Sequence, residues 1–286
     1  MKTNNKKIGL AVIGALFVGI FSGCQPENYA DNGLTTPGLA ASFTITAVEG
    51  KTNRFVLKAD ASKALAVKWD KGEGSYYLGY PIDSLFLPDV GSYNIGLTVV
   101  GKGGVEVKAT KNVVITTPDP KAGNLILGGK FDTADDISKW TVLTISASGT
   151  TWTLADGRAT VTGGGWNQQG IYQTINVVAG RTYKIDMSAS STSGVSNTWF
   201  ETYCSYTAPV QNNDYSADGI KRNINTWDGC GASAFSGKIS SVGCNASKNG
   251  GTFTATTTGV MYFVIKCGGE DLKDGISIDN VEVRGQ

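Results

Sequence analysis

Apolar and polar residues alternate over most of the chain, in short stretches separated by Gly, Pro, Asn and Asp. From residue 40 the pattern recurs in SFTITAVEG, RFVLKADAS, LAVKWD, YNIGLTVVG and EVKATKNVVIT. A period of two is typical of strands with one buried face, and no stretch of useful length has a helical period. Residues 40–117 are therefore predicted to form a small β-sandwich.

The alternation resumes after a break at TPDPKAG, where two prolines and a glycine exclude a strand. Residues 118–123 are therefore predicted to be a linker. Residues 124–286 then hold about ten strand-like segments, from NLILGGKFD to ISIDNVEVR, a number that suits a two-sheet jelly roll. The predicted fold class is all-β, with an N-terminal β-sandwich and a C-terminal β-jelly-roll sandwich.

The N-terminal segment has the order of an export signal. Three lysines precede residues 8–20, which are apolar or small and too few to span a bilayer, for which about 20 residues are needed. The following FSGC resembles the lipobox of bacterial lipoproteins, which implies cleavage before Cys24 and lipidation of that residue. The alternative is an ordinary signal peptide with an incidental cysteine. We predict a lipoprotein signal peptide at 1–23 and a flexible lipidated tether at 24–39.

The composition disfavours several functions. The chain has 25 Lys+Arg and 24 Asp+Glu, and loss of the three signal-peptide lysines leaves 22 against 24, a net charge of −2. Such a chain is a poor ligand for nucleic acid. Histidine is absent, which excludes Ser-His-Asp and Cys-His nucleophilic systems, His-ligated zinc and imidazole acid–base chemistry.

Four cysteines besides Cys24 lie in the last third of the chain. In an exported protein an even number predicts two disulfides, for which three pairings are possible. The preferred pairing is Cys230 with Cys244 and Cys204 with Cys267.

Two motifs within 40–117 resemble those of PKD (polycystic kidney disease) domains. WDKGEG at 69–74 resembles their WDFGDG motif, and GSYNIGLTVVGKGG at 91–104 resembles their closing segment. The resemblance implies an immunoglobulin-like sandwich that acts as a spacer or interaction module, with Trp69 in its core. A ligand-binding Trp69 is the alternative.

Segments throughout 124–286 resemble the jelly-roll carbohydrate-binding modules of the family 4 and 9 type. They are NLILGGKFD followed by a tryptophan, IYQTINVVAGRTYKIDMSA, GTFTATTTG and ISIDNVEVR, although the first lacks the usual Asn and Asp. The resemblance implies a structural calcium ion held by Asp132 and Asp279, since calcium takes several oxygen ligands. The alternative is that both carboxylates are merely solvated. No catalytic cofactor is expected.

A lipid-anchored PKD domain followed by such a jelly roll resembles the surface glycan-binding proteins of Bacteroidetes polysaccharide utilisation loci. This implies a non-catalytic protein on the cell outer membrane that captures polysaccharide, with β-glucan as the family-based expectation, beside transporter and binding proteins of the same system. One alternative is a surface adhesin or assembly protein that binds another protein. The other is a glycoside hydrolase, but no spacing among Glu201, Asp214, Asp218 and Asp228 marks an acid/base pair.

A sugar site needs aromatic rings for the C–H face of the sugar and polar groups for its hydroxyl edge. GGGWNQQGIYQ combines both: it places Trp166 on an expected loop beside Gln168 and Gln169, with Tyr172 at the start of the next strand. The alternative is that Trp166 folds back over the edge of the core.

TWFETYCSY offers a second candidate surface. Alternation places Trp199, Glu201 and Tyr203 on one face of a strand and Phe200 and Cys204 on the other. We expect the second set in the core and the first set exposed as glycan-binding residues. The opposite register would bury Glu201, which then requires a partner.

A long polar insertion at 208–231 supplies the last candidates, Arg222 and Trp227. Loops of this length are usually functional or disordered, and a cysteine near the end favours order. The alternative is that both side chains only pack at a rim.

Overall fold

The computed structural model describes residues 36–244 and 249–286. The signal peptide, Cys24 and most of the tether lie outside the described residues, so these predictions remain untested. Within the described part, no helix is long and apolar enough to cross a membrane.

The chain is all-β, which confirms the predicted fold class. The first sandwich has a three-stranded sheet in the order β1-β2-β5 and a four-stranded sheet in the order β4-β3-β6-β7. Their bounds are β1 Ser42–Ala47, β2 Arg54–Asp60, β3 Ala66–Lys71, β4 Tyr77–Gly79, β5 Ile82–Phe86, β6 Gly91–Val100 and β7 Glu106–Ile115, with the 3₁₀ turn η1 at Lys102–Gly104. Trp69 is 1% exposed and contacts Phe43 edge to face, so it belongs to the core as predicted.

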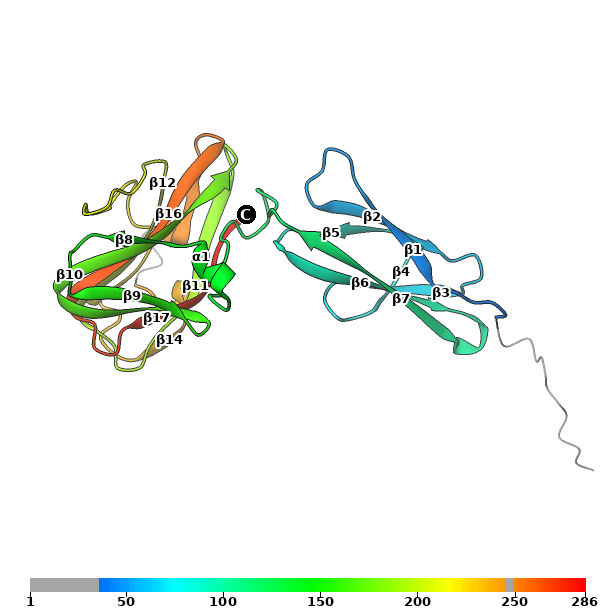
Figure 1. Cartoon of the computed structure of the whole chain (residues 1–286), viewed down its shortest axis with the longest axis horizontal. Coiled ribbons are helices and arrows are strands. Elements are labelled where there is room, and N and C mark those ends of the chain that lie inside the picture. The colour runs from blue at the N-terminus through cyan, green and yellow to red at the C-terminus, as the bar shows by residue number, and fades with distance from the viewer. Residues whose placement is uncertain (1–35, 245–248) are drawn as a thin grey trace, which may run out of the picture.

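The second sandwich follows one path of paired strands, β13-β12-β16-β10-β17-β11-β14. Its elements are α1 Ala134–Ser138, β8 Thr141–Thr144, β9 Thr150–Ala155, β10 Arg158–Val177, β11 Thr182–Ser191, β12 Ser196–Ser205, β13 Arg222–Asn225, η2 Thr226–Asp228, β14 Phe235–Lys238, α2 Ile239–Val242, η3 Asn249–Gly251, β15 Thr252–Thr254, β16 Gly259–Asp271 and β17 Ile276–Gly285. Figure 1 shows β12 and β16 in one layer and β14 and β17 in the other. The main core lies between the layers, and strict alternation in β11 places every second side chain in it.

Strand β10 joins the two layers because its halves have different partners. Residues 158–163 pair with β9, whereas the segment from 164 to 177 pairs with β16. The strand therefore bends between these halves, at its run of three glycines.

Only one of the two preferred disulfides is present. Cys230 and Cys244 are bonded, as predicted. Cys204 and Cys267 are free and buried, so their predicted pairing is wrong. The register explains this: Cys267 lies opposite Phe200, and Cys204 lies four residues further along β12, roughly 13 Å at about 3.3 Å per residue. Burial raises the pKa of both free thiols, which keeps them neutral.

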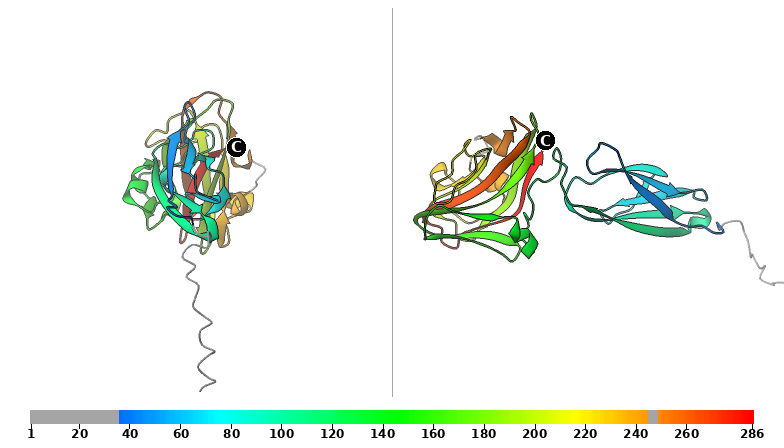
Figure 2. Two further views of the ribbon diagram at one scale, coloured as in Figure 1. Left: turned by 90° about the vertical axis from the view of Figure 1, so that its right-hand side faces the viewer. Right: turned by 45° about the horizontal axis from the view of Figure 1, so that its top comes forward.

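The two sandwiches meet end to end through an ionic contact (Figures 1 and 2). The two terminal NH2 groups of the Arg284 guanidinium, in β17, each donate to one carboxylate oxygen of Asp89 at 2.9 Å. The backbone N–H of Asn124 donates to the same carboxylate at 2.7 Å. The backbone N–H of Asp119 also donates to the carbonyl of Pro88. A bidentate contact fixes orientation as well as distance, so the segment between the sandwiches is held by both of them.

Low pH is expected to loosen this junction. Burial alone raises the pKa of Asp89, but the bonds from Arg284 and Asn124 and the positive charge of Arg284 outweigh it and lower the pKa. A lowered pKa means that the contact is complete above the ordinary value of about 3.9 and is lost as the pH falls through the lowered one. Small-angle X-ray scattering should give the same profile at pH 7 and 5, and a more variable shape only at a pH well below the ordinary value of about 3.9.

Asp89→Asn is the matched control for this prediction. The variant should loosen the junction already at pH 7, with circular dichroism showing both sandwiches folded. An Asp89→Asn profile identical to that of the wild type would show that the ionic contact does not set the orientation.

Candidate functional site

Trp166 lies in a bulge of β10 and not on a loop, so that part of the prediction is wrong. Between Gly164 and Asn167 the chain advances three residues while β16 advances two. The extra residue forms a β-bulge, and Trp166 adopts a φ of 65°, which is rare for a residue with a side chain. The bulge forms where β10 passes from one layer to the other, because there the strand must bend.

Three tryptophans gather at this end of the sheet and are called here the tryptophan cluster: Trp166, Trp199 and Trp227. Trp227 lies between the other two, with ring centroids 6.3 Å from Trp166 and 6.3 Å from Trp199 and interplanar angles of 30° and 32°. Trp166 and Trp227 are 58% and 56% exposed. The cluster therefore presents aromatic surface to solvent.

Trp227 is held by the turn that carries it. In η2 the Asn225 side chain accepts a hydrogen bond from the Trp227 backbone N–H, and Gly229 ends the turn in the left-handed region, with a φ of 91°. The next residue, Cys230, is bonded to Cys244, and the Asn225 N–H points to the Cys244 sulfur at 3.1 Å. The disulfide therefore fixes the segment that positions the central ring.

Trp199 lies flat across the neighbouring strand because that strand has a glycine there. The register aligns Trp199 of β12, Gly268 of β16 and Gln168 of β10 in one row. A Cβ at Gly268 would stand 2.8 Å from the Trp199 ring and 2.5 Å from the Gln168 Cβ, closer than packed carbons approach. Glycine at this position thus leaves room for the indole.

Polar groups lie beside the rings. The side-chain oxygen of Gln168 is buried without a hydrogen-bond partner in the described part of the chain. One pair further along the same face, Asn197 donates to the exposed carboxylate of Glu270 at 2.5 Å. Amide and carboxylate groups next to exposed rings are the combination that a sugar requires.

The predicted exposure of Glu201 and Tyr203 is wrong. Phe200 and Cys204 do face the main core, as predicted, but the opposite face of β12 is covered. The insertion folds back over it, with Tyr215 packing edge to face on Tyr203, so that Glu201 is 9% and Tyr203 2% exposed. A polymer at the surface cannot reach either side chain.

An ionic network lies under the insertion, with Lys266 and Glu201 buried and the Asp214 side chain 55% exposed. Lys266 of β16 donates to Asp214 at 2.7 Å, and its nitrogen is 3.6 Å from Glu201. The Tyr203 hydroxyl donates to Glu201 at 2.5 Å. Burial raises the pKa of Tyr203, and so do its hydrogen bond to Glu201 and the negative charge of that residue. The phenol therefore stays neutral. This network anchors the insertion to the sheet next to the tryptophan cluster.

The remaining predicted glycan-binding residues lie elsewhere. Arg222 is buried and its guanidinium points to the Ile185 carbonyl, which contradicts a surface role. Gln169 is on the face of β10 opposite to Gln168, because successive side chains of a strand alternate. Tyr172 lies along the strand beside Tyr262, at 6.5 Å between ring centroids. Neither Gln169 nor Tyr172 makes a ring contact with the cluster in the described structure.

The calcium prediction receives no support from the described residues. They contain no group of three or more His, Cys, Asp or Glu side chains arranged to hold a metal ion. Both carboxylate oxygens of Asp279 accept hydrogen bonds from Asn280, and Asp132 is exposed. Calcium also takes backbone carbonyl and water ligands, and calcium binding stays an untested prediction.

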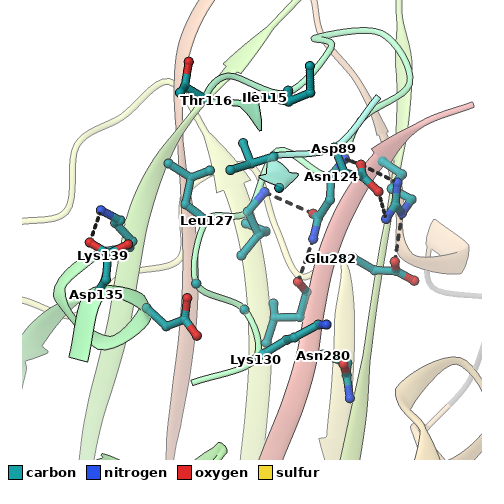
Figure 3. A pocket seen from close by; sticks show the side chains of 18 of the residues that line it. Asp89, Ile115, Thr116, Asn124, Leu127, Lys130, Asp135, Lys139, Asn280 and Glu282 are labelled. Carbon is teal, nitrogen blue, oxygen red and sulfur yellow. Dashed lines mark hydrogen bonds and ion pairs between the residues drawn. The ribbon is translucent and has the colours of Figure 1, made fainter. Parts of the chain in front are cut away.

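A cleft of about 810 Å³ lies at the domain junction, away from the tryptophan cluster. Figure 3 shows Asp135 and Lys139 paired on one side of it and Asp89 on the other. Its lining contains no tryptophan, and these charges already satisfy one another. The cleft therefore lacks the exposed indole surface that the cluster offers.

Removal of the disulfide is expected to weaken both the fold and ligand binding at the cluster. Cys230 and Cys244 are 14 residues apart, and closing a loop of about 15 residues contributes about 3 kcal/mol in the chain-entropy model. Cys230→Ser/Cys244→Ser should lose about this much in denaturant unfolding, and should also lose ligand affinity because the Trp227 turn is released. Cys204→Ser, at a free cysteine, is the comparison variant; an unchanged affinity in the double variant would show that the turn holds without the bond.

Comparison with known proteins gives similarities of fold only. Neither protein-family models nor curated protein sequences match the chain. Among solved structures, the enzymatically active domain of bacteriophage CBA120 tailspike protein 4 is 15% identical, with a TM-score of 0.38 over 57% of this chain and 21% of its own. A CBM4 structure is 20% identical, with a TM-score of 0.36 over 56% and 99%. A carbohydrate-binding module of the β-sandwich superfamily is 14% identical, with a TM-score of 0.32 over 85% and 97%. At such identities and scores, nothing about the ligand of this chain follows from them.

Proposed function

We propose that the protein binds polysaccharide without cleaving it and that the tryptophan cluster is its binding surface. The observation that carries this proposal is that two stacked indole rings, those of Trp166 and Trp227, are each more than half exposed. Exposed apolar area costs about 25 cal/mol per Å² relative to burial, and contiguous exposed patches of this kind mark binding sites.

The polar groups beside the rings point to a sugar as the ligand. An indole stacks on the C–H face of a sugar ring, while the Asn197–Glu270 pair beside the rings meets the hydroxyl edge. The cluster lies on an open surface, which suits a long chain that passes across it. Affinities between millimolar and micromolar, about −4 to −8 kcal/mol, are expected for such a site.

Within the same proposal, the N-terminal sequence supports a location at the cell surface. The lipobox-like FSGC supports a lipid anchor at Cys24, and the polar residues after it support a tether that carries the sandwiches away from the outer membrane. We assign the protein to the capture step of a polysaccharide utilisation system, beside its transporter and other binding proteins. β-Glucan is the first ligand to test.

Affinity electrophoresis against β-glucan, xylan and mannan tests the proposal. Wild-type protein should be retarded by at least one glycan, and Trp166→Ala should lose most of this retardation. Release of reducing sugar should not be detected. A folded wild-type protein that no glycan retards would overturn the proposal, and binding to a protein partner instead would favour an adhesin.

A further inference from the structure

The first sandwich exposes several large apolar side chains that its core does not use. Four of them follow one another around β4 and the start of β5, and are called here the tyrosine edge: Tyr77, Leu78, Tyr80 and Ile82. Their exposed fractions are 63%, 76%, 78% and 62%. Isolated exposed apolar residues are ordinary. Four of them within six positions, with Tyr77 and Leu78 on opposite faces of β4, surround the end of this sheet with accessible apolar side chains, which points to an interaction site.

The tyrosine edge is where the chain crosses between the sheets. β4 is the last strand of one sheet and β5 the last strand of the other, and residues 80–81 connect them (Figure 1). The crossing is fixed from inside, because the Trp69 indole N–H donates to the Tyr80 carbonyl at 2.9 Å. The exposed rings therefore stand on a rigid support.

A small hollow with polar walls lies next to these rings. It measures about 180 Å³ and is lined by Trp69, Lys71, Glu73, Tyr77, Leu78 and Asp83. Lys71 and Asp83 form an ion pair at 3.1 Å, with side chains 39% and 23% exposed. The Asp70 carboxylate accepts the backbone N–H groups of Gly72 and Glu73, which shapes the turn that carries Glu73.

We infer that the tyrosine edge and this hollow form a second glycan-binding site, which engages the same polymer as the tryptophan cluster. Tyrosine rings supply flat apolar faces with hydroxyl groups. The partly exposed Lys71 can donate to sugar hydroxyls, and the carboxylates of Glu73 and Asp83 can accept hydrogen bonds from them, with the Lys71–Asp83 pair orienting both groups. The inference rests on the proposed glycan-binding function and extends it to the first sandwich.

The backbone at this edge favours a glycan over an added protein strand. β4 has only three residues, and Pro81 has no N–H to donate to a docking strand. Short edge strands and proline are features that block strand addition. Recognition at the tyrosine edge therefore depends on side chains, as it does at the tryptophan cluster.

Two linked sites on one chain give a distinct binding signature. A polymer can occupy both sites at once and gains effective concentration, whereas a short oligosaccharide fills one site at a time. Tyr77→Ala/Tyr80→Ala should therefore weaken binding of the retained polysaccharide by about tenfold or more. The affinity of the tryptophan cluster for a short oligosaccharide of the same linkage should not change.

The experiment uses the complete mature chain and calorimetry with both probes. Leu65→Ala removes an equally exposed side chain, 69% exposed, from another part of the same sandwich and should change neither affinity. Leu78→Ser, at a position that is 76% exposed, replaces the double variant if the latter unfolds. In a Trp227→Ala background, weak oligosaccharide binding should persist and should disappear when the tyrosine substitutions are added.

The outcomes separate this inference from the proposed function. Unchanged polymer affinity in both tyrosine-edge variants, with loss of binding in Trp166→Ala, would overturn the second site alone. Loss of self-association in sedimentation with unchanged glycan binding would identify a protein contact and also overturn it. Absence of any binding by the wild-type protein would overturn both.

Discussion

Trp227→Ala is expected to weaken glycan binding at the tryptophan cluster by roughly 30-fold or more, equivalent to about 2 kcal/mol, the level typical of a binding hot spot. Trp227 is the central ring and contacts both Trp166 and Trp199. Its removal interrupts the aromatic surface, whereas loss of Trp166 only shortens it. Calorimetry with an oligosaccharide of the retained glycan should therefore give a lower affinity for Trp227→Ala than for Trp166→Ala.

Thermal unfolding distinguishes a binding ring from a structural one. Trp227 is 56% exposed, so its removal leaves no cavity and should leave the unfolding midpoint nearly unchanged. Trp152 is the matched control: it is 6% exposed and its indole N–H donates to the Gln169 carbonyl at 3.1 Å. Trp152→Ala should cost about 3–5 kcal/mol. A similar loss in Trp227→Ala would mean that the cluster serves packing and not binding.

The sequence predicts the strands well because alternation reports directly which face is buried. In TWFETYCSY it correctly assigns Phe200 and Cys204 to the main core. The opposite face is a different matter, since alternation says only that Glu201 and Tyr203 leave that core. Whether they reach water depends on the insertion, whose Tyr215 packs over them, and no local pattern encodes that contact.

The candidate site could be predicted only in part for a related reason. The sequence GGGW indicates an unusual backbone. It does not distinguish a loop from a bulge that joins two layers, because both require the same glycines. Trp227 meets Trp199 because of strand register and the Cys230–Cys244 disulfide, both of which are long-range. Gly268 is a local signal of this site, since a glycine within a strand often marks the close approach of another group. The sequence alone does not show that the approaching group is the Trp199 ring.

Within the ionic network under the insertion, substitution of Lys266 is expected to cause the largest loss of stability. Its side chain is 5% exposed and lies against Glu201, Asp214 and the Tyr203 ring. Lys266→Met keeps most of the volume but leaves the carboxylate of Glu201 buried without a counter-charge. Breaking a buried pair in this way costs about 3–5 kcal/mol, which denaturant unfolding should measure.

A double variant tests whether the charge itself is the cause. In Lys266→Met/Glu201→Gln the unpaired charge is absent, and replacement of a buried pair by neutral groups is often close to neutral in stability. The double variant should therefore recover most of the loss. Lys68→Met, at an exposed ion pair with Glu106, should change stability little, because solvent screens exposed pairs. Equal losses in the single and double variants would assign the effect to packing under the insertion. Because this network holds the insertion beside Trp199, Lys266→Met should also weaken glycan binding, and the double variant should restore it in step with stability.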